Sequence, residues 1–205
     1  MLKAISLGCR RGERKLFSDL SLSLNSGQML HVQGANGSGK TSLLRILAGL
    51  SRQDNGKILW KNTDIHAMHD EYASSLLYLG HQPAVKDDLT VIENLLVSTQ
   101  ISGVNPTSDA LKSAIEVVGL SRQSNLPARV LSQGQRRRLA LARLWLDHKP
   151  LWILDEPFTA LDAEATILLE AQLEKHLATG GMVVLTTHQS QSITENYLCV
   201  LRLEP

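Results

Sequence analysis

The sequence has few cysteines and no large excess of charge of either sign. Only two of its 205 residues are cysteines, Cys9 and Cys199, and they lie near opposite ends of the chain. This usage favours a reducing compartment over a disulfide framework. Basic and acidic residues nearly balance, 21 against 20, for a net charge of +1. Such a balance gives no long-range field for holding nucleic acid, so no nucleic-acid partner is expected.

Long apolar runs are missing as well. No stretch reaches the about 18 to 20 residues that a membrane-spanning helix needs. Residues 1–9 are too few, before the charges of Arg10 and Arg11, to contain the apolar region of a secretory signal. We therefore expect a soluble or peripheral protein. Its length predicts one domain over 1–205, with room for a subdomain.

Residues 34–41 match the phosphate-binding loop pattern G-x-x-x-x-G-K-[ST] at every position. The flanking order is also the required one, because a strand-like run at 28–33 precedes the loop and apolar residues with helical spacing follow it at 43–47. Glycines let backbone N–H groups approach phosphate oxygens, while Lys40 would supply charge between the β- and γ-phosphates and Thr41 a hydroxyl for Mg²⁺. The nucleotide-binding candidates are the loop and the residue after it: Gly34, Ala35, Asn36, Gly37, Ser38, Gly39, Lys40, Thr41 and Ser42.

Continuous apolar runs predict buried strands elsewhere in the chain. They lie at 76–79, 151–154 and 182–185, and a helical pattern over about 162–178 separates the last two. Strands that alternate with helices predict a parallel α/β core.

Two further regions depart from this alternation. Residues 2–24 read as strand, turn and strand, and 57–60 reads as another strand of the same sheet, which predicts an antiparallel β subdomain at the N-terminal end. Residues from about 84–148 read as a helical insert, in which Thr90 and Glu93 have the spacing of a capping box. The expected fold class is α/β, a P-loop NTPase core with these two subdomains.

Two carboxylates follow the apolar run at 151–154. Ligands of an open α/β sheet bind at the carboxyl ends of its strands, which is where Asp155 and Glu156 would lie. Neighbouring side chains on a strand point to opposite faces, so the two need not do the same work. Asp155 is the natural partner of Mg²⁺, and Glu156 is placed to orient and deprotonate an attacking water.

A third element lies at 131–138. The hydroxyl of Ser132 and the backbone N–H of Gly134 would open a helix over 135–147, whose amino terminus is an anion site. The arginines at 136–138 crowd that positive end, at about 0.3 to 1 kcal/mol per charge. Either a phosphate from outside relieves this repulsion, or the arginines form a solvated face.

The segment 131–135 reads Leu-Ser-Gln-Gly-Gln and resembles the L-S-G-G-Q signature of the ATP-binding cassette family, with Gln133 in place of the middle glycine. Further family positions follow in order along nearly the whole chain. Gln82 is similar to the glutamine that couples the nucleotide site to the helical insert. Asp162 is similar to the aspartate that ends the loop after the paired carboxylates, and His188 to the switch histidine.

This resemblance implies hydrolysis of ATP, with Mg²⁺, between two copies of the chain, so that Ser132 and Gly134 of one copy close over the γ-phosphate bound to the other. It assigns catalysis to Lys40, Gln82, Glu156 and His188. It assigns Mg²⁺ to Thr41, Gln82 and Asp155. It adds four nucleotide contacts outside the phosphate loop, at Ser132, Gly134, Gln135 and Asp162.

Within the family, the chain resembles the ATP-binding subunits of the haem exporter of bacterial cytochrome c maturation. The residues that carry this resemblance lie at 80–83, 138–146, 151–160 and 185–189. It implies a peripheral subunit on the cytoplasmic face of the inner membrane, bound to membrane-embedded proteins of the same system. ATP would power either movement of haem or release of a haem-loaded chaperone.

Three alternatives stay open at this point. The chain could serve another exporter of the family, or be a soluble cassette ATPase of translation or DNA repair, although the short separation of Gln82 from Leu131 disfavours the second class. It could also bind nucleotide without turnover. The intact Lys40, Asp155, Glu156 and His188 argue against this alternative.

The first hairpin departs from the family pattern. Similar cassettes stack adenine on an aromatic residue there, whereas residues 9–13 read Cys-Arg-Arg-Gly-Glu. Arg11 could stack its planar guanidinium on the base. Otherwise the base is loosely held.

Overall fold

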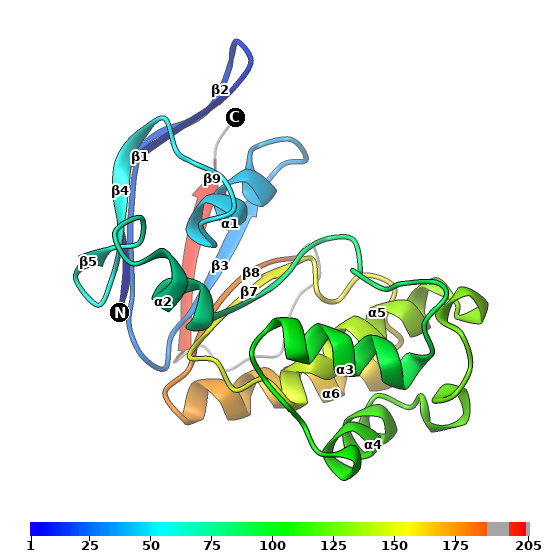
Figure 1. The fold of residues 1–205 in the computed structure, drawn as a ribbon. Coiled ribbons are helices and arrows are strands. Elements are labelled where there is room, and N and C mark those ends of the chain that lie inside the picture. Colours follow the sequence, from blue (N-terminus) through cyan, green and yellow to red (C-terminus); the bar gives the residue numbers. More distant parts are fainter. Residues whose placement is uncertain (188–196, 204–205) are drawn as a thin grey trace. The chain divides into compact units, whose positions relative to one another are not determined.

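The computed structural model describes residues 1–187 and 197–203, and the chain divides into two compact units (Figure 1). Unit 1 consists of Met1–Tyr78, Lys149–Glu156 and Leu173–Pro205, and unit 2 of Leu79–His148 and Pro157–Gln172. In the described part of the chain, no helix combines the length and apolar character needed to cross a membrane.

Unit 1 contains a five-stranded sheet with the strand order β6-β7-β8-β3-β9. Its strands are β3 (Met29–Gly34), β6 (Leu76–Leu79), β7 (Leu151–Asp155), β8 (Met182–Thr186) and β9 (Leu198–Leu203). β7 pairs with β8, and β3 with β8 and β9, in parallel. Every residue of β7 and β8 is buried, which is typical of strands covered on both faces. The helix α1 (Lys40–Leu47) contacts β3, β7 and β8, and the predicted parallel α/β core is confirmed.

The second sheet of unit 1 is antiparallel, with the order β2-β1-β4-β5. Its strands are β1 (Leu2–Arg11), β2 (Arg14–Leu24), β4 (Asn55–Trp60) and β5 (Thr63–Asp64). β1 and β2 form a hairpin whose register runs from Leu2 opposite Leu24 to Arg11 opposite Arg14. The short helix α2 (His69–Ser74) follows β5 in the chain. The N-terminal antiparallel sheet is thus present as predicted.

Unit 2 is mainly helical. Its elements include α3 (Val91–Ile101), α4 (Ser108–Val117), α5 (Gln133–Leu141), the 3₁₀ turns Ser121–Gln123, Ala128–Val130 and Ala142–Trp145, and the first ten residues of α6 (Ala163–Ala178). The predicted capping box opens α3, because the backbone N–H of Glu93 donates to the Thr90 hydroxyl and that of Thr90 donates to the Glu93 carboxylate. Hydrogen bonds from the Thr90 hydroxyl, and then from its N–H, lower the pKa of Glu93.

Candidate functional site

The phosphate loop, residues 34–41, joins the end of β3 to the start of α1. Its glycines are needed for different reasons. Gly39 has a φ of 102° immediately before the helix, and a Cβ on Gly34 would lie 2.6 Å from Ser38 Oγ and 2.7 Å from the Leu203 carbonyl oxygen. The Lys40 ammonium lies over its own loop and donates to the carbonyls of Gly34 at 2.8 Å and Ala35 at 3.2 Å. The loop therefore keeps its charge beside the backbone that would receive phosphate.

Asp155 ends β7 beside the first turn of α1. The residue is 2% exposed, and its carboxylate accepts hydrogen bonds from the Thr41 hydroxyl at Oδ2 and the Thr186 hydroxyl at Oδ1, both at 2.8 Å. A carboxylate and a hydroxyl are the hard oxygen donors that Mg²⁺ takes, usually with waters in its remaining positions. Two of the three predicted metal ligands, Thr41 and Asp155, therefore lie in contact and suit that ion.

Glu156, the next residue, is half-buried and has a φ of 51°, in the left-handed region. Such a backbone in a residue other than glycine costs of order 1 to 3 kcal/mol and is concentrated at functional sites. The Glu156 N–H donates to the Thr186 hydroxyl at 2.9 Å, so one buried side chain holds both Asp155 and the backbone of Glu156. Residue patterns did not reveal Thr186; the only signal is a polar residue that closes the apolar run 182–185.

The helix at the signature begins two residues earlier than predicted. Ser132 is the N-cap of α5, which starts at Gln133 rather than at Gln135. The reason is a capping box, in which the Gln135 N–H donates to Ser132 Oγ at 3.2 Å and the Ser132 N–H donates to Gln135 Oε1 at 2.9 Å. The α-helix also ends early, at Leu141, and the chain tightens into the 3₁₀ turn Ala142–Trp145 instead of continuing to Asp147.

Gly134 lies where α5 meets the segment before α6. A Cβ on Gly134 would come within 2.7 Å of the carbonyl oxygen of Ala160, so the backbone approach requires glycine. Asp162 lies two residues further along the chain, and its carboxylate accepts from the Ala165 N–H at 2.8 Å at the start of α6. Within unit 2, the signature segment therefore lies against the loop that ends at Asp162.

The three arginines after the signature have three different environments. Arg136 forms an ion pair with Asp87, and Arg138 donates to the Val118 carbonyl at 3.2 Å. Arg137 is 4% exposed. Its guanidinium donates to the carbonyls of Gly80 at 3.0 Å, His81 at 3.3 Å and Pro157 at 3.3 Å. For Arg137 the solvated-face interpretation is wrong, because backbone carbonyls replace water around its charge.

We expect Arg137→Met to lower the free energy of unfolding by about 2 to 4 kcal/mol, because a buried charged donor to three carbonyls is lost. The matched control is Arg136→Met on the same helical turn, where the Asp87 partner is largely exposed and the loss should be at most about 1 kcal/mol. Denaturant unfolding of both variants measures the difference. Equal losses would show that the carbonyl contacts of Arg137 add nothing beyond a surface ion pair.

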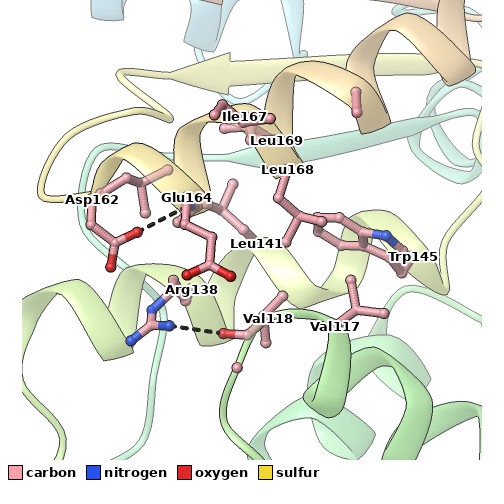
Figure 2. A pocket seen from close by; sticks show the side chains of 14 residues that line it. Val117, Val118, Arg138, Leu141, Trp145, Asp162, Glu164, Ile167, Leu168 and Leu169 are labelled. Atoms are coloured by element: carbon pink, nitrogen blue, oxygen red, sulfur yellow. Dashed lines mark hydrogen bonds between the residues drawn. The ribbon is translucent and has the colours of Figure 1, made fainter.

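A cavity of about 360 Å³ lies within unit 2, between the end of α4, the helix α5 with the turn after it, and α6 (Figure 2). Figure 2 shows Trp145 and Leu168 at one end and Arg138, Asp162 and Glu164 at the other. Its mainly apolar walls suit an aliphatic or aromatic group better than a phosphate. Asp162 and Arg138 are both held by backbone partners at its edge.

The predicted site residues gather in two groups. Unit 1 holds Lys40, Thr41, Asp155 and Glu156, together with Thr186. Unit 2 holds Gln82, Ser132, Gly134, Gln135 and Asp162. Gln82 is exposed in the segment after β6, and His188 lies outside the described residues.

Comparison with known proteins is consistent with this geometry. The family model for ABC transporters matches residues 17–159. The cytochrome c biogenesis ATP-binding export protein CcmA of Nitrosomonas europaea is 54% identical, over 92% of this chain and 89% of the relative.

Two solved structures share the fold. An ATP-binding subunit of an ABC transporter has a TM-score of 0.85 at 22% identity and covers 100% of this chain and 88% of its own. The ATP-binding cassette MJ0796, in a dimeric post-hydrolysis state with ADP and Pi, has a TM-score of 0.79 at 21% identity. The match covers 100% of this chain and 97% of that chain. The chain therefore belongs to the ABC transporter family, as an ATPase of that family.

Proposed function

We propose that this chain is the ATP-hydrolysing subunit of a membrane complex for bacterial cytochrome c biogenesis, and that haem is what the complex handles. The observation that carries the hydrolytic part is the contact of Thr41 with Asp155, next to Glu156, at the mouth of the phosphate loop. The cytochrome c part is supported by the name of the 54% identical relative.

Within one copy, residues of unit 1 would bind the nucleotide. Backbone N–H groups of the phosphate loop and the start of α1 hold the phosphates, and Lys40 moves its ammonium from two loop carbonyls to phosphate oxygens. Thr41 and Asp155 would hold Mg²⁺, which would supply positive charge to the bound phosphates. The family resemblance adds Gln82, a residue of unit 2, as a further ligand. Glu156 orients the attacking water and accepts its proton.

The second half of the site would come from another copy. The capping box leaves the amino terminus of α5 at Ser132 as a fixed set of N–H groups and dipoles, which is suited to the γ-phosphate of the partner copy. Gly134, Gln135 and Asp162 lie in the same unit and would line that face. His188 would contact the γ-phosphate of the nucleotide bound to its own copy. Hydrolysis removes the shared phosphate, so the two copies separate and move the membrane subunits. We place the chain on the cytoplasmic face of the inner membrane, bound to those subunits.

The test is a pull-down from solubilised membranes. The recovered complex is then placed in liposomes, where ATP hydrolysis and haem transfer are both measured. We expect cytochrome maturation proteins to be recovered, and haem transfer that depends on ATP.

Lys40→Ala should weaken ATP binding at least about tenfold and abolish turnover, since it removes the point charge of the loop. Recovery of an unrelated permease would overturn the cytochrome c assignment. An ATPase rate unaffected by Lys40→Ala would overturn the hydrolytic site.

A further inference from the structure

The start of β2 lies against the phosphate loop. A Cβ on Gly39 would be 3.1 Å from Leu16 Cβ, and a Cβ on Gly37 would be 3.7 Å from the Nη1 atom of Arg14. The pairing of β1 with β2 is irregular between Cys9 and Arg10, so simple alternation of side chains does not apply at Leu16. The contacts themselves show that the Arg14 and Leu16 side chains both reach the loop. Leu16 is buried there, whereas Arg14 is exposed.

Positive charge is concentrated at this end of the hairpin. Arg11 stands directly opposite Arg14 across the two strands, and Arg10 stands opposite Lys15. Directly opposed residues share a face, so the Arg11 and Arg14 side chains lie on one side of the sheet and Arg10 and Lys15 on the other. In the parts of the chain that the structure describes, none of these four side chains has a carboxylate partner. Like charges directly opposed are destabilising, so an arriving anion would relieve this pair.

We propose that Arg14 binds the phosphates of the nucleotide held by the phosphate loop, with Arg11 adding positive potential from the neighbouring strand. The inference rests on the proposed function, because it takes residues 34–41 as the nucleotide site. A guanidinium presents planar donors that match phosphate oxygens, and charge-assisted bonds of this kind are stronger than neutral ones. Arg14 has no side-chain hydrogen bond or ion pair among the described residues, so no internal bond is broken when it turns to the ligand.

This assignment differs from base stacking by Arg11. The group beside Gly37 is the Arg14 guanidinium, and it lies over a loop whose ligand is phosphate rather than base. Phosphates are common to all nucleoside triphosphates. Arg14 therefore raises affinity for the whole class and does not select adenine. Residues 9–13 also include no aromatic side chain that could stack on the base.

Equilibrium binding of ATP and of GTP, each with Mg²⁺, to the purified full chain tests the proposal. Arg14→Ala should weaken binding of both nucleotides about tenfold, and Arg14→Lys should recover part of the loss because the charge remains. The matched control is Arg10→Ala, which removes the same charge from the opposite face of the same hairpin and should change both constants less than about twofold. Raising salt should weaken wild-type binding more steeply than that of Arg14→Ala.

Three results would overturn the proposal. One is a loss in Arg14→Ala no larger than in Arg10→Ala, provided thermal unfolding shows both variants folded. Another is a loss for ATP with GTP binding intact, which indicates a contact with the base. The third is a larger loss in Arg11→Ala than in Arg14→Ala. Failure of the proposed function looks different, because wild type and Lys40→Ala would then bind nucleotide equally poorly.

Discussion

Glu156→Gln should slow ATP hydrolysis by about 10² to 10⁴-fold and leave ATP binding intact. The amide has the shape of the carboxylate but cannot accept the proton of the attacking water, and general bases contribute factors of this size. The backbone at Glu156 is held by its N–H bond to the Thr186 hydroxyl, which the substitution does not touch. The altered side chain should therefore keep its position. Phosphate release and nucleotide affinity, measured on the same preparation, separate the two effects.

Glu71→Gln is the control for this prediction. It makes the same chemical change at an exposed position of α2, also in unit 1, and should leave turnover within about twofold of wild type because its carboxylate faces solvent. If Glu156→Gln keeps a third or more of the wild-type rate, Glu156 is not the base. A parallel loss of ATP affinity would instead assign the carboxylate to binding.

Local patterns predicted the parts of the fold that depend on neighbours in the chain. The glycine loop at 34–41 carries its own conformational requirement, and the buried runs of β7 and β8 are continuous enough to identify as strands. The Thr90–Glu93 capping box is also a four-residue pattern. The same spacing exists at Ser132 and Gln135, so the first turn of α5 could have been predicted.

The rest of the candidate site depends on contacts between distant segments. Thr186 meets Asp155 because β7 and β8 are paired in that register, which no short pattern encodes. Arg137 reaches carbonyls at Gly80 and His81, more than 50 positions earlier in the chain. Arg14 lies beside Gly37 of the phosphate loop, a contact that no residue pattern indicated. In each case the residue type indicated the chemistry, and the packing chose the partner.

The second large effect is expected at Ser132, where Ser132→Asp should lower ATP turnover at least about tenfold relative to Ser132→Asn. Aspartate and asparagine are both favourable N-cap residues, so both variants should keep the first turn of α5, where the Gln135 N–H now donates to Ser132 Oγ. Only aspartate brings a negative charge to the place where a second copy would present its γ-phosphate. Repulsion between the aspartate carboxylate and that phosphate, in a site closed to water, would oppose closure of the two copies.

Binding of ATP to a single copy should be the same in both variants, because in the proposed mechanism Ser132 contacts only the nucleotide that is bound to the other copy. Helix content by circular dichroism checks that the cap is kept, and size-exclusion chromatography with ATP in the Glu156→Gln background measures pairing directly. We expect dimers with asparagine and monomers with aspartate. Equal turnover and equal pairing in the two variants would mean that no phosphate approaches Ser132. In that case the capping box would serve only to start α5, and the second half of the site would have to lie elsewhere in the chain.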